Sequence, residues 1–121
     1  MLTPLRRFGD HGEDLAAAYL EKNGYRIMAR QVRVGRMGEL DLICRQGATI
    51  VFVEVKTRSS DAFGTPEDAM GQWKRNRFRR SIESWLLSHH LSEAAFRADV
   101  VAVDLSRPSP VIRHHQGIEL L

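Results

Sequence analysis

GELDLI at residues 38–43 and IVFVEVKTR at residues 50–58 place three carboxylates and a lysine within two otherwise apolar segments. Four consecutive apolar residues, 50–53, predict a strand that is covered on both faces. Carboxylates at the end of such a strand must be ligated, paired or protonated, because burying an unpaired charge is unfavourable. Two carboxylates about 4 Å apart repel by roughly 4 kcal/mol at an effective dielectric constant of about 20. The pattern therefore predicts a cation site, and ligands that are all oxygen favour Mg²⁺ or Mn²⁺ over Zn²⁺.

The overall composition is that of one compact intracellular protein. With 121 residues the chain can form one core but not two, so we expect residues 1–121 to be a single domain. The lone Cys44 offers no disulfide framework and fits a reducing cytoplasm. No apolar stretch approaches the roughly 18 residues of a membrane span, and residues 1–7 lack a secretory apolar region. We therefore expect a soluble, cytoplasmic protein that has no membrane partner.

The basic residues are strongly biased towards arginine. The formal net charge is +3, and of the 18 basic residues only Lys22, Lys56 and Lys74 are lysine. The planar guanidinium fork suits bidentate contact with phosphate oxygens, so a polyanionic partner is favoured. Composition leaves open whether that partner is nucleic acid or an acidic protein.

Local signals predict the order αβββαββ. A helix is expected over residues 13–23, with Asp10 as N-cap, Glu13 in a capping box and Gly24 at its end. Three strands follow at residues 25–32, 39–45 and 49–57, and residues 58–64 form an exposed loop beside the carboxylates. A second helical region starts at Thr65 and Pro66, with Gly71 separating its first turns. Strands at residues 96–105 and 111–117 close the chain. This order predicts an α/β fold with a mixed central sheet flanked by helices.

The turn between the second and third strands sets the geometry of the carboxylates. Gly47 at the first position of a two-residue loop, Gly47-Ala48, suits a type II′ turn. Counting back along this hairpin, Asp41 lies across from Glu54, and Glu39 lies across from Lys56. Because side chains alternate along a strand, all four are predicted to point the same way. Glu13 is on the inward face of the first helix and is able to complete the site.

These residues together resemble the PD-(D/E)xK nuclease superfamily. The chain is most similar to the bacterial YraN-like family, which is related in fold to archaeal Holliday-junction resolvases, and the similarity runs from Gly12-Glu13 to residues 97–101. It implies a restriction-endonuclease-like fold, with Asp41 and Glu54 as metal ligands. Glu13 is implied as an accessory ligand and Lys56 as the catalytic lysine. The proline that often precedes the aspartate in that superfamily is replaced by Leu40.

The resemblance implies a Mg²⁺- or Mn²⁺-dependent endonuclease that hydrolyses DNA and is selective for branched or junction structures. A homodimer is compatible with this function, as is a monomer. The alternative is a non-catalytic nucleic-acid-binding or repair-accessory module that keeps the nuclease fold. Sequence leaves open DNA versus RNA, the substrate structure and whether catalysis is retained. It also leaves Glu39, Gln72 or Lys74 as unassigned additions to the site.

Several residues outside the acidic pattern have two interpretations. Basic residues that either bind phosphates or form a solvated face are Arg58, Lys74, Arg75, Arg77, Arg79 and Arg80. Glu13 is either a plain capping residue or a ligand. Trp73, Phe78 and Trp85 are expected in the core rather than as base-stacking platforms. The pairs His89-His90 and His114-His115 are expected to be exposed, because adjacent residues point apart. Asp99, early in a buried strand, is expected to anchor the structure.

Overall fold

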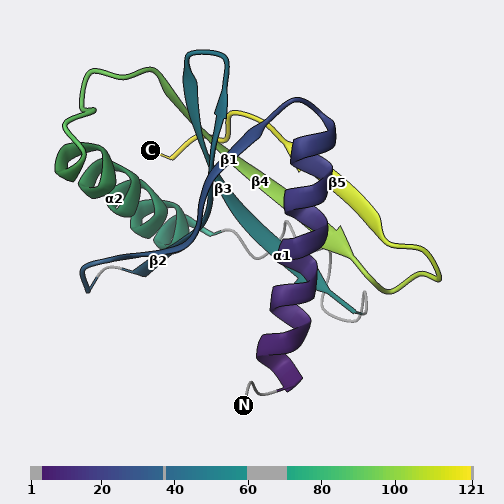
Figure 1. Ribbon diagram of the computed structural model, residues 1–121. Coiled ribbons are helices and arrows are strands. Elements are labelled where there is room, and N and C mark those ends of the chain that lie inside the picture. Colours follow the sequence, from purple (N-terminus) through teal and green to yellow (C-terminus); the bar gives the residue numbers. More distant parts are fainter. Residues whose placement is uncertain (1–3, 37, 60–70, 121) are drawn as a thin grey trace.

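The computed structural model describes residues 4–36, 38–59 and 71–120, and for residues 4–10 it describes the backbone alone. Within these described residues, two helices and five strands follow in the predicted order αβββαββ (Figure 1). Their bounds are α1 Pro4–Lys22, β1 Arg26–Val34, β2 Gly38–Gln46, β3 Thr49–Arg58, α2 Gln72–Ser88, β4 Phe96–Asp104 and β5 Val111–His115.

The five strands form one mixed sheet with the order β1-β2-β3-β4-β5. β3 and β4 run parallel, and the other neighbours are antiparallel. A parallel pair needs a long crossover, and α2 lies within the connection between β3 and β4. α1 and α2 cover opposite faces of the sheet (Figure 1). The predicted α/β fold with a mixed sheet flanked by helices is confirmed.

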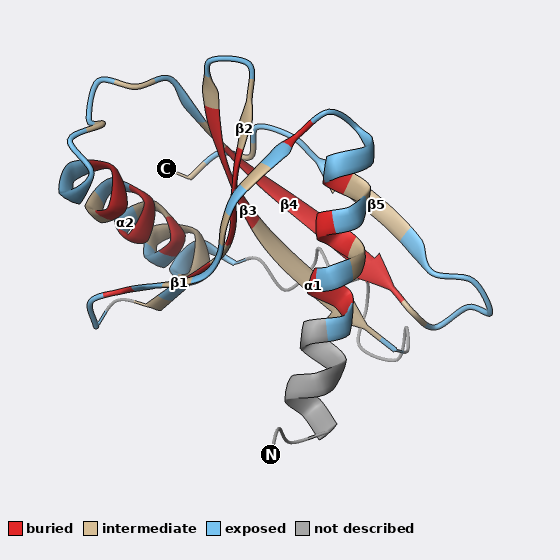
Figure 2. Ribbon diagram, in the orientation of Figure 1, coloured by how far each residue is buried: buried red, intermediate tan, exposed pale blue. Residues whose placement is uncertain are grey.

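The core has two parts, one on each face of the sheet (Figure 2). On one face α2 packs Phe78, Ile82, Trp85 and Leu86 against the sheet. On the other face α1 contributes Ala16, Ala17 and Leu20. Residues 50–53 of β3 lie between these layers and are at most 1% exposed. The apolar run therefore marks a strand covered on both faces, as predicted.

The β2–β3 hairpin has the predicted register. Gln46 pairs with Thr49 across the loop Gly47-Ala48, and pairing continues as far as Leu42 and Val53. Gly47 has a φ of +60°, the positive value that the first position of a type II′ turn requires. The loop therefore has an even number of residues, so odd-numbered residues of β2 lie opposite even-numbered residues of β3.

The predicted start of the first helix is wrong, whereas its end is confirmed. α1 begins at Pro4 instead of residue 13, so Asp10 lies inside the helix and is not its N-cap. Proline suits the first helical position because its missing N–H has no partner there in any case. The Asp10–Glu13 spacing also occurs within helices, so this pattern alone does not mark a start. At the other end Gly24 has a φ of +88°, and the N–H of Tyr25 donates to Leu20, which stops the helix.

α2 begins directly after Gly71, its N-cap. The predicted start at Thr65-Pro66 and residues 60–64 of the predicted exposed loop lie outside the described residues. β4 and β5 are slightly shorter than predicted and end at Asp104 and His115. In the part of the chain that the structure describes, neither helix is long and apolar enough to cross a membrane.

Gly12 brings α1 close to β3. A Cβ added at Gly12 would lie 2.9 Å from the Cβ of Thr57, which is too near for a rotamer change to relieve. We expect Gly12→Ala to lower the melting temperature, because overpacking of about 1–3 kcal/mol outweighs a gain in helix propensity of about 1 kcal/mol. Gly71→Ala is the control, since an added Cβ there meets nothing within 4 Å. A raised melting temperature for Gly12→Ala would contradict this close packing.

Candidate active site

The site lies in a notch where β2 and β3 separate. Their pairing ends at Leu42 and Val53, after which β2 pairs only with β1 and β3 only with β4. Asp41 occupies the opening, and its Oδ2 accepts a hydrogen bond from the N–H of Val55 over 2.8 Å. A side-chain oxygen thus replaces the backbone partner that the neighbouring strand no longer supplies. We call this opening the acidic notch, formed by Glu13, Asp41, Glu54, Lys56 and Lys74.

Asp41 and Glu54 meet in the acidic notch. Burial raises the pKa of Asp41 to about 8, and the negative charge of Glu54 acts in the same direction. The Val55 N–H opposes this pKa shift, while the charge of Glu13 and a hydrogen bond with Glu54 add to it. Asp41 of β2 therefore interacts with both Glu54 of β3 and Glu13 of α1.

Glu13 reaches the acidic notch from α1 and is only 7% exposed. Its carboxylate accepts from the Nε of Arg30 over 3.2 Å and from the Nε2 of Gln31 over 3.5 Å. Because α1 begins at Pro4, Glu13 is not a capping-box residue, and that alternative is wrong. Arg30 and Gln31 were not anticipated from the sequence. Both lie in β1 and are more than 15 residues away along the chain, so no local spacing connects them to Glu13.

β2 does not alternate regularly at Asp41. Leu42 packs in the core beneath α1, whereas Leu40 packs in the core beneath α2. Residues two apart in a regular strand share a face, so the strand changes face at Asp41. The predicted regular alternation of Glu39 with Asp41 is therefore wrong, although Glu39 lines the same cavity as Glu54. The pairing of β2 and β3 ends before Glu39, which is exposed, and the ion pair of Lys56 is with Glu54 instead.

β1 changes face opposite the same point. Arg30 contacts Glu13 of α1, whereas Val32 packs against the core beneath α2. Gln31 between them has a φ of +52°, a left-handed conformation that non-glycine residues rarely adopt. Strain of this kind persists where the surrounding structure holds it and is common at functional sites. The paired irregularities let Asp41 contact groups from both faces of the sheet.

Two lysines contact Glu54. The Nζ of Lys56 is 3.3 Å from Glu54 Oε1, and the Nζ of Lys74 is 4.0 Å from the same oxygen. A hydrogen bond with Lys56 lowers the pKa of Lys74, as do burial and the positive charge of Lys56, while Glu54 and Asp41 oppose the shift. Gln72, the other unassigned helix residue, instead donates to Asn76 within α2. Lys74 is therefore the helix-borne residue that reaches the acidic notch.

A cavity of about 210 Å³ opens beside these groups. Its lining includes Glu39, Glu54, Lys74 and Arg77, so carboxylates and cations face the same space. Gly38 has a φ of +145°, and an added Cβ would lie 2.9 Å from the Nε of Arg77. Glycine at residue 38 thus lets the Arg77 guanidinium lie against β2 at the rim of the acidic notch.

The arginines predicted to bind nucleic acid have different surroundings. Arg75 donates to the backbone oxygen of Glu119, and Arg79 forms an ion pair with Glu83 at 3.2 Å. Arg58 is half-buried at the end of β3, whereas Arg77 and Arg80 are exposed. The six basic residues therefore do not form a single solvated face, and Arg77 and Arg80 are the best placed for a polyanion.

Two predictions about burial, those for Trp73 and His114, are wrong, whereas the predicted exposure of His89, His90 and His115 is confirmed. Phe78 and Trp85 are in the core as expected, but Trp73 is 70% exposed. Helical spacing places Trp73 off the face that contains Phe78, Ile82 and Trp85, so it misses the sheet. His114 was expected to be exposed, yet its side chain is 5% exposed, because β5 turns it inward and leaves only His115 outside.

Asp99 is the structural anchor that was predicted. It is completely buried and accepts hydrogen bonds from Arg97 Nε at 2.8 Å, the Gly117 N–H at 3.0 Å and His114 Nε2 at 2.7 Å. The Arg97 guanidinium also donates to the hydroxyl of Tyr25. This network ties β4 and β5 together beneath α1. It is separate from the acidic notch, and its carboxylate is fully engaged by donors.

The donors of the acidic notch are those that Mg²⁺ prefers. Among the described residues, no three His, Cys, Asp or Glu side chains are arranged as a metal cage. Magnesium, however, is usually held by one or two carboxylates together with waters and substrate phosphates. Asp41 and Glu54 supply two carboxylates of this kind, and their mutual repulsion is the unfavourable interaction that a cation removes.

Comparison with known proteins matches the sequence to one family, and the solved structures include a weaker similarity. The sequence model described as "Uncharacterised protein family UPF0102" matches residues 12–103, which include every acidic-notch residue. A UPF0102 protein of Moorella thermoacetica is 45% identical over 116 residues, 96% of this chain and 92% of the relative. One of Syntrophus aciditrophicus is 47% identical over 104 residues, 86% and 81%. The structure of Pyrococcus furiosus SfsA with Ca²⁺ is 16% identical, with a TM-score of 0.38, and the match covers 95% of this chain and 65% of that protein.

Proposed function

The chain belongs to the UPF0102 family, and we propose that it is a metal-dependent endonuclease of the PD-(D/E)xK type that hydrolyses DNA phosphodiester bonds. The observation that carries the proposal is the meeting of Glu13, Asp41 and Glu54 with Lys56 in one notch. Bringing three carboxylates together does not stabilise a sheet, because the charge of each carboxylate disfavours the charged form of the others.

Asp41 and Glu54 would hold a Mg²⁺ or Mn²⁺ ion, with Glu13 as an accessory ligand. When bound, the cation supplies a Lewis acid for the scissile phosphate and a more acidic water for in-line attack. The Val55 N–H fixes the orientation of Asp41, and Arg30 and Gln31 fix that of Glu13. These contacts hold the carboxylates in place before substrate arrives.

Lys56 is the proposed catalytic lysine. Its Nζ lies 3.3 Å from Glu54 Oε1, so Glu54 holds this positive charge beside the position proposed for the phosphate. A fixed cation stabilises the extra negative charge on the phosphate in the transition state and orients the attacking water. Lys74, whose Nζ lies near the same Glu54 oxygen and which lines the cavity, would neutralise the charge of the incoming phosphate.

The experiment that tests the proposal uses pure protein with labelled linear duplex, single-stranded and four-way-junction DNA, and a single strand of RNA. Each substrate is incubated with Mg²⁺, Mn²⁺ or a chelator. Products that require the cation and that vanish in Lys56→Ala support the nuclease. Binding without products in every condition would favour the other function, an accessory module that binds nucleic acid without cleaving it.

Phosphate binding by the exposed arginines of α2 is tested by salt dependence. We expect Arg77→Glu combined with Arg80→Glu to weaken DNA binding irrespective of base sequence. The slope of log affinity against log salt should shrink by roughly one unit for each phosphate that the protein no longer neutralises. Arg107→Glu, in the exposed turn between β4 and β5, is a single charge reversal away from α2 and should leave the slope nearer to that of the parent protein. Equal slopes for all three proteins would mean that these arginines are solvated and do not bind phosphate.

A further inference from the structure

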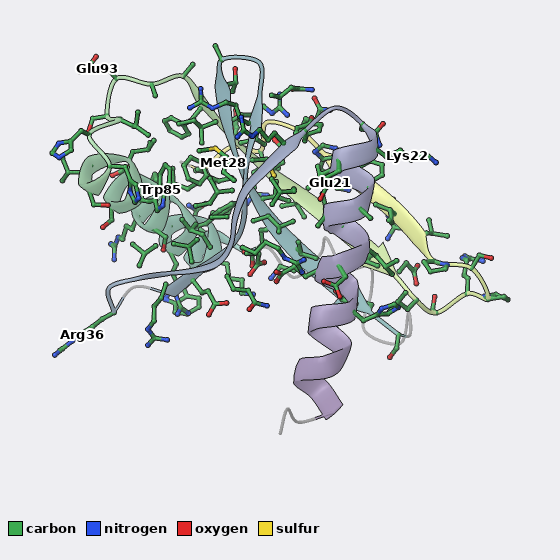
Figure 3. All side chains as sticks on the ribbon, in the orientation of Figure 1. Glu21, Lys22, Met28, Arg36, Trp85 and Glu93 are labelled. Atoms are coloured by element: carbon green, nitrogen blue, oxygen red, sulfur yellow. The ribbon has the colours of Figure 1, made fainter. Side chains whose placement is uncertain are left out.

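An exposed aromatic ring among arginines lies next to the acidic notch. A second cavity, of about 360 Å³, is lined by Arg36, Trp73, Asn76, Arg77 and Arg80, which we call the Trp73 patch. On α2, residues 73, 76, 77 and 80 lie three or four apart and share one face of the helix. Arg36 extends outward from the turn between β1 and β2, whereas Trp85 lies between α2 and the sheet (Figure 3).

The Trp73 ring is accessible rather than packed. Its residue is 70% exposed, in contrast to 7% for Trp85. The Arg77 guanidinium carbon lies 5.4 Å from the Trp73 ring centroid, so a cation–π contact steadies the ring while leaving most of its surface open. Among the residues that the structure describes, the lining of the Trp73 patch contains three arginines and no acidic side chain, which makes it complementary to a polyanion.

We propose that the Trp73 patch binds an unpaired nucleotide of single-stranded DNA, with the base stacked on Trp73 and its flanking phosphates on Arg36, Arg77 and Arg80. Aromatic rings beside a basic groove recognise single strands in this way, because every unpaired base offers a π face. Bases within a closed duplex are already stacked on their neighbours and do not offer that face.

The Trp73 patch lies next to the cavity that contains the proposed catalytic residues. Arg77 lines both the Trp73 patch and the cavity that contains Glu54 and Lys74. A strand whose base stacks on Trp73 can therefore continue over Arg77 towards the carboxylates. The inference rests on the proposed function to this extent: the preferred substrate is DNA with a single-stranded segment next to the cleaved bond, such as a flap, a gap or an opened junction.

The first test measures tryptophan fluorescence of the full chain in a chelator, so that no cleavage occurs. Trp73 and Trp85 are the two tryptophans, and Trp85 is buried. We expect an oligothymidylate to quench the fluorescence of the parent protein and not that of Trp73→Phe. A relaxed, covalently closed circular duplex has no unpaired bases and should leave the fluorescence of both proteins unchanged. No quenching by the oligothymidylate, or equal quenching by polyglutamate, would overturn the proposal, the second result by indicating an acidic protein partner.

The second test measures affinity by the anisotropy of labelled DNA. We expect Trp73→Leu to bind single-stranded DNA about tenfold more weakly than the parent protein. The variant loses one base–aromatic stack, and such stacks contribute roughly 1–3 kcal/mol. Trp73→Phe keeps a ring and should lose less. Leu87→Ala removes another exposed apolar side chain of α2, 69% exposed, and should bind as the parent does. An equal loss of duplex and single-strand binding in Trp73→Leu would overturn the proposal.

The two proposals fail separately. If the protein cleaves DNA with Mg²⁺ but its Trp73 fluorescence is not quenched, the stacking proposal is wrong and the nuclease proposal stands. A protein whose Trp73 is quenched by single strands in chelator, but which yields no products with any cation, keeps the stacking site and refutes the nuclease.

Discussion

Asp41→Asn is expected to abolish metal-dependent cleavage while making the metal-free protein more stable. Removing a residue that only supports a metal ligand already lowers affinity or activity by about 10- to 100-fold, so removing a ligand itself should exceed that range. Asparagine has nearly the same shape and keeps an oxygen to accept from the Val55 N–H, but it has no carboxyl group to ionise beside Glu54 and Glu13. A gain of about 1–4 kcal/mol is expected, which spans the repulsion of two charges about 4 Å apart in bulk water and at an effective dielectric constant of about 20. This corresponds to a rise of roughly 3–20 °C in melting temperature.

The pH dependence of stability provides the check on Asp41. Its pKa is raised to about 8, above the ordinary value of 3.8. A carboxyl group that is more easily protonated in the folded state favours folding at low pH, and this contribution is lost as the pH rises from about 4 to about 8. Melting curves in chelator over this range should fall for the parent protein and fall less steeply for Asp41→Asn.

Two further variants test whether charge repulsion causes the change in stability. Glu39→Gln, an exposed carboxylate on the same strand, should leave both the melting temperature and its pH profile unchanged. Glu54→Gln should also abolish cleavage, but with less gain in stability, because it leaves Lys56 and Lys74 without their shared carboxylate. A large loss of stability in Asp41→Asn would mean that this residue has a structural role.

Asp99→Ala is expected to produce the largest loss of stability. The carboxylate is completely buried and accepts from Arg97, His114 and the Gly117 N–H. Removing one partner from a buried charged network typically costs about 3–5 kcal/mol, because the remaining charge is left without compensation. For a chain of this size the melting temperature should fall by roughly 10–20 °C. A change below about 1 kcal/mol, within the range of many surface substitutions, would refute the anchoring role.

The pH dependence of Asp99 has the opposite sign to that of Asp41. Burial alone would raise the pKa of Asp99, but hydrogen bonds from His114, Arg97 and Gly117 outweigh burial and hold it below 3.8. This contribution to stability is present above about pH 4 and is lost as the pH falls below it. Urea titrations at acidic pH should show a weaker pH dependence for Asp99→Asn than for the parent. Glu93→Gln, an exposed carboxylate in the turn before β4, is the control.

Much of the sheet follows from local chemistry. The apolar run 50–53 requires cover on both sides, and Gly47-Ala48 fixes an even loop, so the pairing that places Asp41 near Glu54 can be counted along the chain. Gly24 marks the end of α1 because its left-handed conformation suits glycine. Each of these signals is contained in a few neighbouring residues, which is why the amino-acid sequence alone identifies the carboxylates and Lys56 as a group.

The remaining features depend on contacts between distant segments. The change of face at Asp41 requires Gln31 in a left-handed conformation, which the identity of a glutamine does not indicate. The choice of Lys74 over Gln72, the exposure of Trp73 and the burial of His114 depend on which side of each element meets the sheet. Periodicity defines a face within one helix or strand, but its rotation about its own axis is set by packing against neighbours, whose position the local sequence does not contain.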